Sequence, residues 1–169
     1  NDEWEVGFMD GIQVLRLAGG ITHKSGSYFL RTLSEFLLPL LMIYKLRKSP
    51  FNDVRWNLII WYSPTIFFGP LIWKMKRGSG CKTYLILRDI FPEWALDLGL
   101  IRNGIAYAFF KSIANFQYSV ADTIGVQTKS NLTYLMDWEN RPHRNLQVLQ
   151  NWQTPNKNIG TSINVSNTS

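Results

Sequence analysis

The sequence is poor in the side chains that form covalent and metal cross-links. Its 169 residues include one cysteine, Cys81, and two histidines, His23 and His143. A single cysteine excludes an internal disulfide framework and a cysteine-rich zinc site, and it favours a reducing compartment. The two histidines lie in separate polar segments, which argues against a histidine dyad or a metal site. We therefore expect a fold that depends on its apolar core, with no bound metal.

Long apolar runs and phosphate-binding loops are also missing. The longest apolar run, Phe36 to Tyr44, has nine residues and contains Pro39, whereas a helix that spans a bilayer core needs about 20. Residues 1–10 are acidic rather than basic, which is not the pattern of a secretory signal peptide. The sequence contains no glycine-rich loop of the GxGxxG or Walker type. These absences leave a globular domain without a motif-defined nucleotide site.

Basic residues are in excess, but they occur in short groups. The formal net charge is +6 and the pI is about 9.6. The groups are Lys45, Arg47 and Lys48, and then Lys74, Lys76 and Arg77. Such a balance is typical of proteins that meet anionic lipid headgroups, phosphate-bearing substrates or nucleic acid. Because no long basic run or RNA-binding signature is present, we do not expect a nucleic-acid partner.

The hydrophobic pattern alternates between strand and helix. Two extended apolar runs, Trp4 to Met9 and Ile12 to Leu17, flank Asp10-Gly11 and predict a hairpin. The later predicted strands are 56–62, 83–87, 123–127 and 146–149, and the predicted helices are 27–47, 65–77, 93–98, 105–121 and 130–138. This order predicts an α/β fold with a doubly wound, Rossmann-like parallel sheet. Residues 56–62 and 83–87 are almost continuously apolar, so we expect both strands to be buried on both faces.

We expect one domain over residues 1–152, and the polar composition of residues 153–169 indicates a linker or a disordered tail. In parallel sheets of this kind, ligands bind outside the carboxyl ends of the strands. The candidate residues are those at or just after these ends, together with Glu93 in the helix that follows: Ser63, Pro64, Arg88, Asp89, Glu93, Lys129, Asn151 and Trp152.

Arg88 and Asp89 are the strongest catalytic candidates, because charged side chains directly after an apolar strand need a partner or a ligand. Arginine suits phosphate or carboxylate groups, and aspartate can accept hydrogen bonds from sugar hydroxyls or act as a base. The alternative is a structural ion pair that closes the strand. Glu93 alternatively stabilises the start of its helix. Lys129 lies at a helix start that could bind an anion, where Thr128 or Ser130 could instead act as an ordinary cap.

The helix from Phe29 to Lys48 also has two interpretations. Its apolar positions could enter a membrane surface while Lys45, Arg47 and Lys48 meet anionic headgroups. Alternatively, the helix simply packs on the sheet. The apolar stripe is broad and contains Pro39, and the sequence does not decide between the two.

Two segments of the chain resemble a known enzyme family. YSPTIFFG (62–69) and LILRDIFPEWALDLGL (85–100) are similar to the acceptor-domain core of family 4 glycosyltransferases, where one strand ends in Ser-Pro and the next in Arg-Asp or His-Asp ahead of an aromatic-Pro pair. The N-acetyl-L-fucosamine transferase group of O-antigen assembly is the nearest group. VLQNWQTP (148–155) resembles, less specifically, the passage from the family's first domain to its second.

The resemblance implies half of a GT-B fold, whose other half binds the nucleotide-sugar donor. Such enzymes usually retain the anomeric configuration, and their acceptors are often lipid-linked sugars at the cytoplasmic membrane face. By position, Arg88 and Asp89 would lie beside the transferring sugar. Ser63, Pro64, Glu93 and Lys129 would contact substrate, and Asn151 and Trp152 would lie at the hinge. Many members have histidine where this chain has Arg88. Because a guanidinium cannot act as a base, Arg88 would stabilise charge and Asp89 would be the basic partner.

Measured against this family, the chain begins after the usual first strand and loop and lacks the donor domain. We therefore expect no sugar transfer by the chain alone. The alternative function is a non-catalytic subunit that binds the acceptor or docks on the membrane and works with a separate donor-binding chain. Without its first strand the sheet would have an unpaired edge, so we expect marginal stability or self-association.

Overall fold

The structure, a computed structural model, describes residues 4–17, 28–63 and 65–150. Strand β1 (Trp4–Met9) and strand β2 (Ile12–Leu17) form an antiparallel hairpin in which Met9 lies opposite Ile12. The turn residues Asp10 and Gly11 have φ angles of 51° and 79°. Aspartate and glycine tolerate this left-handed region better than most residues, and the predicted hairpin is confirmed.

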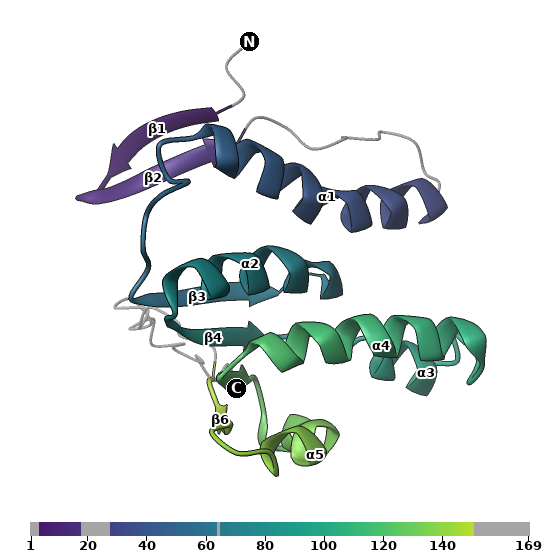
Figure 1. The fold of residues 1–169 in the computed structure, drawn as a ribbon. Helices are drawn as coiled ribbons and strands as arrows, with labels where there is room; N and C mark the ends of the chain where they lie inside the picture. Colours follow the sequence, from purple (N-terminus) through teal and green to yellow (C-terminus); the bar gives the residue numbers. More distant parts are fainter. Residues whose placement is uncertain (1–3, 18–27, 64, 151–169) are drawn as a thin grey trace, which may run out of the picture.

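Four further strands form a parallel sheet (Figure 1). Their order across the sheet is β3 (Leu58–Ser63), β4 (Lys82–Leu87), β5 (Thr123–Val126) and β6 (Asn145–Val148). Ser63 pairs in register with Leu87, and Leu87 with Val126. The carboxyl ends of β3, β4 and β5 therefore meet at one edge. The α/β prediction is confirmed as a parallel sheet with flanking helices, consistent with part of a Rossmann-like domain.

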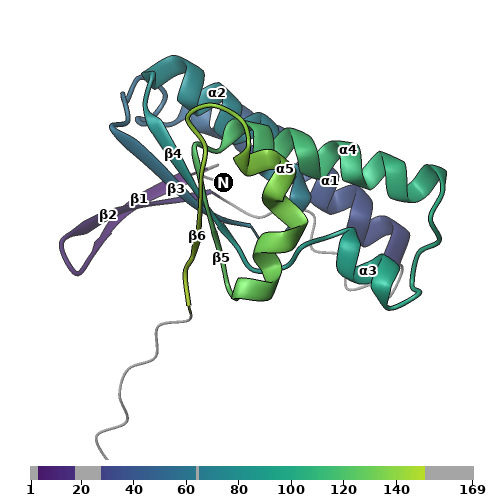
Figure 2. The same cartoon turned by 90° about the horizontal axis from the view of Figure 1, so that it is seen from below.

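Helices cover one face of this sheet (Figure 2). The longer ones are α1 (Tyr28–Lys48), α2 (Gly69–Ser79) and α4 (Ile105–Val120). The short ones are α3 (Glu93–Asp97), α5 (Met136–Glu139) and two 3-10 helices, η1 (Ile66–Phe68) and η2 (Lys129–Leu135). The predicted helix at 130–138 is thus mostly 3-10, and the predicted helix at 65–77 begins with a 3-10 turn.

The core lies between the sheet and the helices. Leu85 and Leu87 of β4 and Ile124 and Val126 of β5 are almost completely buried. They face α4, whose Tyr118 is also buried in the same cluster. Burial of this apolar layer is the main stabilising contribution to the fold.

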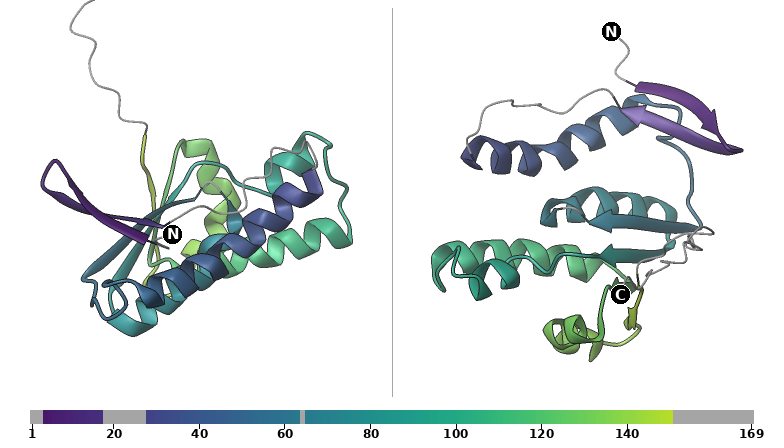
Figure 3. Two further views of the ribbon diagram at one scale, coloured as in Figure 1. Left: turned by 90° about the horizontal axis from the view of Figure 1, so that it is seen from above. Right: turned by 180° about the vertical axis from the view of Figure 1, so that it is seen from behind.

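The opposite face of the sheet has no helix over it in the described residues, and the expectation that both faces are buried is wrong for β3 and only partly met by β4, where Tyr84 and Ile86 are half-buried. Along β3, Ile59, Trp61 and Ser63 are buried, whereas Leu58, Ile60 and Tyr62 are 50%, 59% and 52% exposed. Figure 3 (right) views the sheet from the side that no described helix covers. An apolar run suits burial on two faces, but among the described residues only one face has a partner layer.

A polar cluster ties the starts of β4 and β5 to α2. The Lys76 ammonium lies 2.9 Å from Asp122 Oδ2, and the Thr83 backbone N–H donates to the same oxygen over 2.8 Å. Burial acts to raise the pKa of Asp122, but the hydrogen bonds from Lys76 and Thr83 and the Lys76 charge outweigh it, so this pKa is lowered. The cluster holds together the amino ends of β4 and β5, opposite the carboxyl ends where the candidate site lies.

Candidate functional site

The candidate site lies where β3, β4 and β5 end. Arg88 directly follows Leu87, the residue paired with Ser63, so the segments after β3 and β4 leave the sheet side by side. Lys129 begins η2 shortly after β5. The parallel register thus brings together Ser63, Arg88 and Asp89, as the sequence predicted, with Lys129 at the same edge of the sheet.

Arg88 and Asp89 have no internal partner in the part of the chain that the structure describes. Arg88 is half-buried and Asp89 is exposed. Neither makes a hydrogen bond or an ion pair with another described residue. A structural Arg–carboxylate pair, the alternative interpretation, is therefore not found there. A half-buried guanidinium next to a free carboxylate leaves both groups available to a ligand.

Ser63 is held by the protein itself. Its side chain is buried, its hydroxyl donates to the Thr65 carbonyl over 2.8 Å, and it accepts from Gln117 Nε2 over 2.7 Å. The Phe68 backbone N–H in turn donates to Gln117 Oε1 over 3.2 Å. This network anchors the segment after β3 to α4. The geometry thus gives Ser63 a positioning role at the carboxyl end of β3.

Glu93 is also buried and internally paired. Its Oε1 accepts from the Lys111 ammonium of α4, while its Oε2 is buried without a partner among the described residues. Burial, and then the charge of Glu93, raises the pKa of the Tyr118 hydroxyl. The Glu93–Lys111 pair fastens α3, and with it the segment that follows Arg88 and Asp89, to α4.

Lys129 is exposed, and Thr128 makes no side-chain capping hydrogen bond at the start of η2. The capping alternative for Thr128 is therefore not found. Lys129 can add positive charge at this end of the sheet. Pro64, Asn151 and Trp152 lie outside the described residues, as does the polar tail predicted for residues 153–169.

Helix α4 supplies the supporting residues that sequence reasoning missed: Lys111, Gln117 and Tyr118. A signal for Gln117 is present in the sequence. It shares the helical spacing of Ala114, Tyr118 and Ala121, all of which are buried. A polar residue within such a stripe needs buried hydrogen-bond partners, and here these are Ser63 and Phe68.

Comparisons with family models, curated proteins and solved structures find no match for this chain. The chemistry of the site therefore follows from its residues. Over the described ranges, no cluster of three or more His, Cys, Asp or Glu side chains could hold a metal ion. Among the described helices, none combines the length and apolar character needed to cross a bilayer. What this end of the sheet presents is a half-buried guanidinium, an exposed carboxylate and a lysine, a set suited to a ligand with both phosphate and hydroxyl groups.

Proposed function

We propose that the chain is the acceptor-side domain of a retaining glycosyltransferase that moves a sugar from a nucleotide-sugar donor to a lipid-linked saccharide in surface polysaccharide assembly. The observation that carries the proposal is that the neighbouring side chains of Arg88 and Asp89, at the carboxyl end of β4 and beside the end of β3, have no partner among the described residues. The resemblance of residues 62–69 and 85–100 to family 4 glycosyltransferases supports the same assignment. The protein would work at the cytoplasmic membrane face as a peripheral enzyme.

In this proposal Arg88 and Asp89 have different tasks. The Arg88 guanidinium carries a permanent charge and pairs with a phosphate oxygen, where it also stabilises charge that develops during transfer. The Asp89 carboxylate accepts a hydrogen bond from the acceptor hydroxyl and takes its proton. The buried Ser63–Gln117 and Glu93–Lys111 contacts keep the adjoining segments in place, so that the pair is oriented before substrate arrives.

The donor would bind a second domain, and the isolated chain would bind acceptor without transferring sugar. Titration of the purified chain with a short-chain polyprenyl-diphosphate sugar, followed by calorimetry, tests this. Loss of a charge-assisted hydrogen bond costs about 1.5–3 kcal/mol. Arg88→Ala should therefore weaken binding roughly 10–100-fold. Lys82→Ala is the matched control, because Lys82 is an exposed cation at the opposite end of the same strand.

Equal affinity of wild-type chain and Arg88→Ala for the acceptor analogue would overturn the assignment of this edge. Sugar turnover by the wild-type chain with a nucleotide sugar would instead contradict the expected inactivity of the chain alone. The two outcomes are separate, because the first measures binding and the second measures transfer.

A second candidate is a non-catalytic subunit that docks on the membrane. It is favoured by the apolar side chains that α1 leaves exposed: Leu33, Phe36, Leu37, Leu40 and Tyr44. The main contacts of α1 inside the protein are with α2, η1 and β2, so the Phe29 to Lys48 segment packs chiefly on other helices and the hairpin while it keeps an exposed apolar side. Acceptor binding that is unaffected by Arg88→Ala but requires vesicles would favour this second candidate.

A further inference from the structure

A basic cavity lies at the sheet edge opposite Arg88 and Asp89. Helices α1 and α2 run antiparallel to the strands, so both end near the starts of β3 and β4 (Figure 1). The cavity between them has a volume of about 410 Å³. Arg47 of α1, Lys74 of α2 and Arg55 of the connection to β3 line it, together with one carboxylate, Asp53. Three cations from three different segments thus face one cavity.

None of these cations makes an ion pair within the described ranges, although Asp53 lines the same cavity. Asp53 accepts a hydrogen bond from Asn52. Partial burial, and then the nearby charge of Arg47, lowers the pKa of Lys74. Helix dipoles account for Arg47 in the last turn of α1, but Lys74 lies before the last turn of α2. Such dipoles do not explain like charges from three segments around one cavity, an arrangement that complements a phosphate group.

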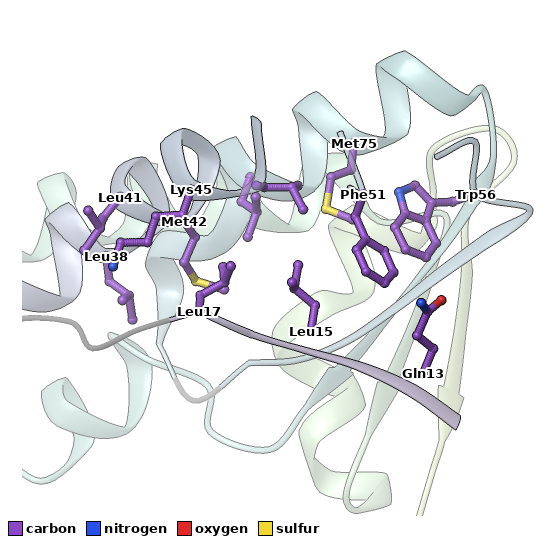
Figure 4. Close-up of a pocket in the computed structure, with 12 residues that line it drawn as sticks. Gln13, Leu15, Leu17, Leu38, Leu41, Met42, Lys45, Phe51, Trp56 and Met75 are labelled. Atoms are coloured by element: carbon purple, nitrogen blue, oxygen red, sulfur yellow. The ribbon is translucent and has the colours of Figure 1, made fainter. Parts of the chain in front are cut away.

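An apolar cavity adjoins the basic one. It has a volume of about 470 Å³ and lies between β2, α1 and α2 (Figure 4). Leu15 and Leu17 of β2 face Leu38 and Met42 of α1 across it. Four residues line both cavities: Leu46, Phe51, Trp56 and Met75. Phe51 and Trp56 stack with ring centroids 6.1 Å apart at one end. The two cavities therefore share a wall. The first is lined by cations, and the second is mostly apolar, with Gln13 and Lys45 as its polar side chains.

We propose that the two cavities together bind one anionic phospholipid of a membrane surface. Its phosphate would lie among Arg47, Arg55 and Lys74, and an acyl chain would lie between β2 and α1. A free phosphate would need only the basic cavity, whereas the adjoining apolar cavity matches an amphiphile. The exposed apolar stripe of α1 would rest on the same membrane. The site is independent of Arg88 and Asp89 and of the reaction proposed for them.

Vesicle sedimentation tests the charge requirement. The probes are vesicles of phosphatidylcholine alone and vesicles with equal parts of phosphatidylcholine and phosphatidylglycerol. The double variant Arg47→Ser/Lys74→Ser is compared with Arg102→Ser/Arg141→Ser, which removes two exposed cations that do not line the cavity. Each basic residue near an anionic surface contributes about fivefold to binding. The first variant should therefore bind the anionic vesicles roughly 10–30-fold more weakly than wild type, and the loss in the second variant should be several-fold smaller.

Fluorescence tests the acyl-chain position. Vesicles with brominated acyl chains should quench the emission of the wild-type chain more than that of Trp56→Phe, because Trp56 lines the apolar cavity. Trp94→Phe removes an exposed tryptophan at the other edge of the sheet. In this variant the bromine quenching that comes from Trp56 should remain. Circular dichroism of each variant checks that it is folded.

Three results would overturn the proposal. The first is equal binding to both kinds of vesicle, which would indicate a purely apolar contact. The second is an equal loss of binding in both double variants, which would indicate an effect of net charge alone. The third is displacement by inorganic phosphate at low concentration without any quenching of Trp56, which would indicate a site for free phosphate.

Discussion

At the residue scale, Asp122 joins three elements through one carboxylate. It accepts from Lys76 of α2 and from Thr83 of β4, and it lies directly before β5. Its pKa is lowered in the folded protein, so folding favours the ionised form. The stability that Asp122 contributes is therefore present above its unfolded pKa of about 3.9 and is lost as the pH falls towards the folded value.

Asp122→Asn tests this linkage. Hydrogen bonds to a charged group contribute about 1.5–3 kcal/mol, so we expect the variant to lose about 2 kcal/mol in the free energy of unfolding at pH 7. The difference from wild type should begin to shrink below about pH 4, where the unfolded carboxyl takes up a proton, and should vanish only at the lower pH where the folded carboxyl is protonated as well. Urea unfolding across this pH range measures it. Asp137→Asn, at an exposed position on α5, should change little at any pH, and a pH-independent loss in Asp122→Asn would contradict the account.

The positions of single residues at the site could be predicted from the sequence where those residues directly follow a strand. Arg88 and Asp89 follow an apolar strand, and the parallel register alone places them beside the end of β3. The inward hydrogen bonds of Ser63 could not be predicted, because its partner Gln117 lies 54 positions away on α4. Sequence spacing carries no information about which helix will cover a given strand end.

At the element scale, the start of α2 depends on a close approach to α4. Gly69 is buried, and a Cβ added there would lie 2.9 Å from the Phe116 ring and 3.1 Å from the Gln117 Cα. The backbone of Gly69 is itself helical, with φ −46° and ψ −49°, so alanine could adopt it. Space, rather than conformational freedom, is what requires glycine at this position.

The two glycines of α2 form a matched pair for testing this contact. Gly69→Ala should destabilise the protein by about 1–3 kcal/mol, since the Phe116 ring or the whole helix must shift. Gly78 lies in the same helix, and a Cβ there meets nothing within 4 Å. Gly78→Ala should therefore stabilise by about 0.5–1 kcal/mol through helix propensity. Thermal unfolding measures both, and equal shifts in the same direction would contradict the packing argument.

Most elements were predictable because their signals are local. The Asp10-Gly11 turn, the apolar spacing of α1 and the Gly80 that ends α2 act over a few residues. The 3-10 helix η2 was harder to predict. Its residues carry an ordinary helical pattern, and whether such a segment closes i+3 or i+4 hydrogen bonds depends on how it joins neighbouring elements.

At the scale of the whole molecule, the open face of the sheet is the largest departure from expectation. All-parallel sheets are nearly always covered on both faces, yet Ile60 and Tyr62 of β3 are more than half exposed. Strand β3 is also the edge strand of the described sheet, with β4 as its one neighbour there. An apolar face next to an unpaired edge favours self-association.

Ile60→Lys tests whether this face drives association. Burying an isoleucine contributes about 1.5–3 kcal/mol. The variant should therefore self-associate more weakly, with a dissociation constant raised roughly tenfold or more. Sedimentation velocity over a concentration series measures it. Ile105→Lys, at the highly exposed start of α4, is the matched control and should sediment like wild type. A wild-type chain that stays monomeric at every concentration would contradict the prediction.

The coverage of the sheet could not be predicted from the sequence. An apolar strand is compatible with burial on both faces, but its composition does not show whether a second layer covers it. The run from Leu58 to Tyr62 would suit two covered faces, and in the described residues only the face with Ile59 and Trp61 is covered. Composition and periodicity describe one strand at a time, whereas coverage is a property of the assembled layers.

The direction in which the chain moves across the sheet constrains what could close the open face. Connections between parallel strands are almost always right-handed crossovers. The steps from β3 to β4 and from β4 to β5 progress the same way, so α2 and α4 come to lie on one side (Figure 2). A helix reaches the other side only when the chain progresses in the opposite sense, outward from β3. A parallel strand paired with the free edge of β3, if the chain continued outward from β3 to reach it, would carry its crossover helix over the uncovered face.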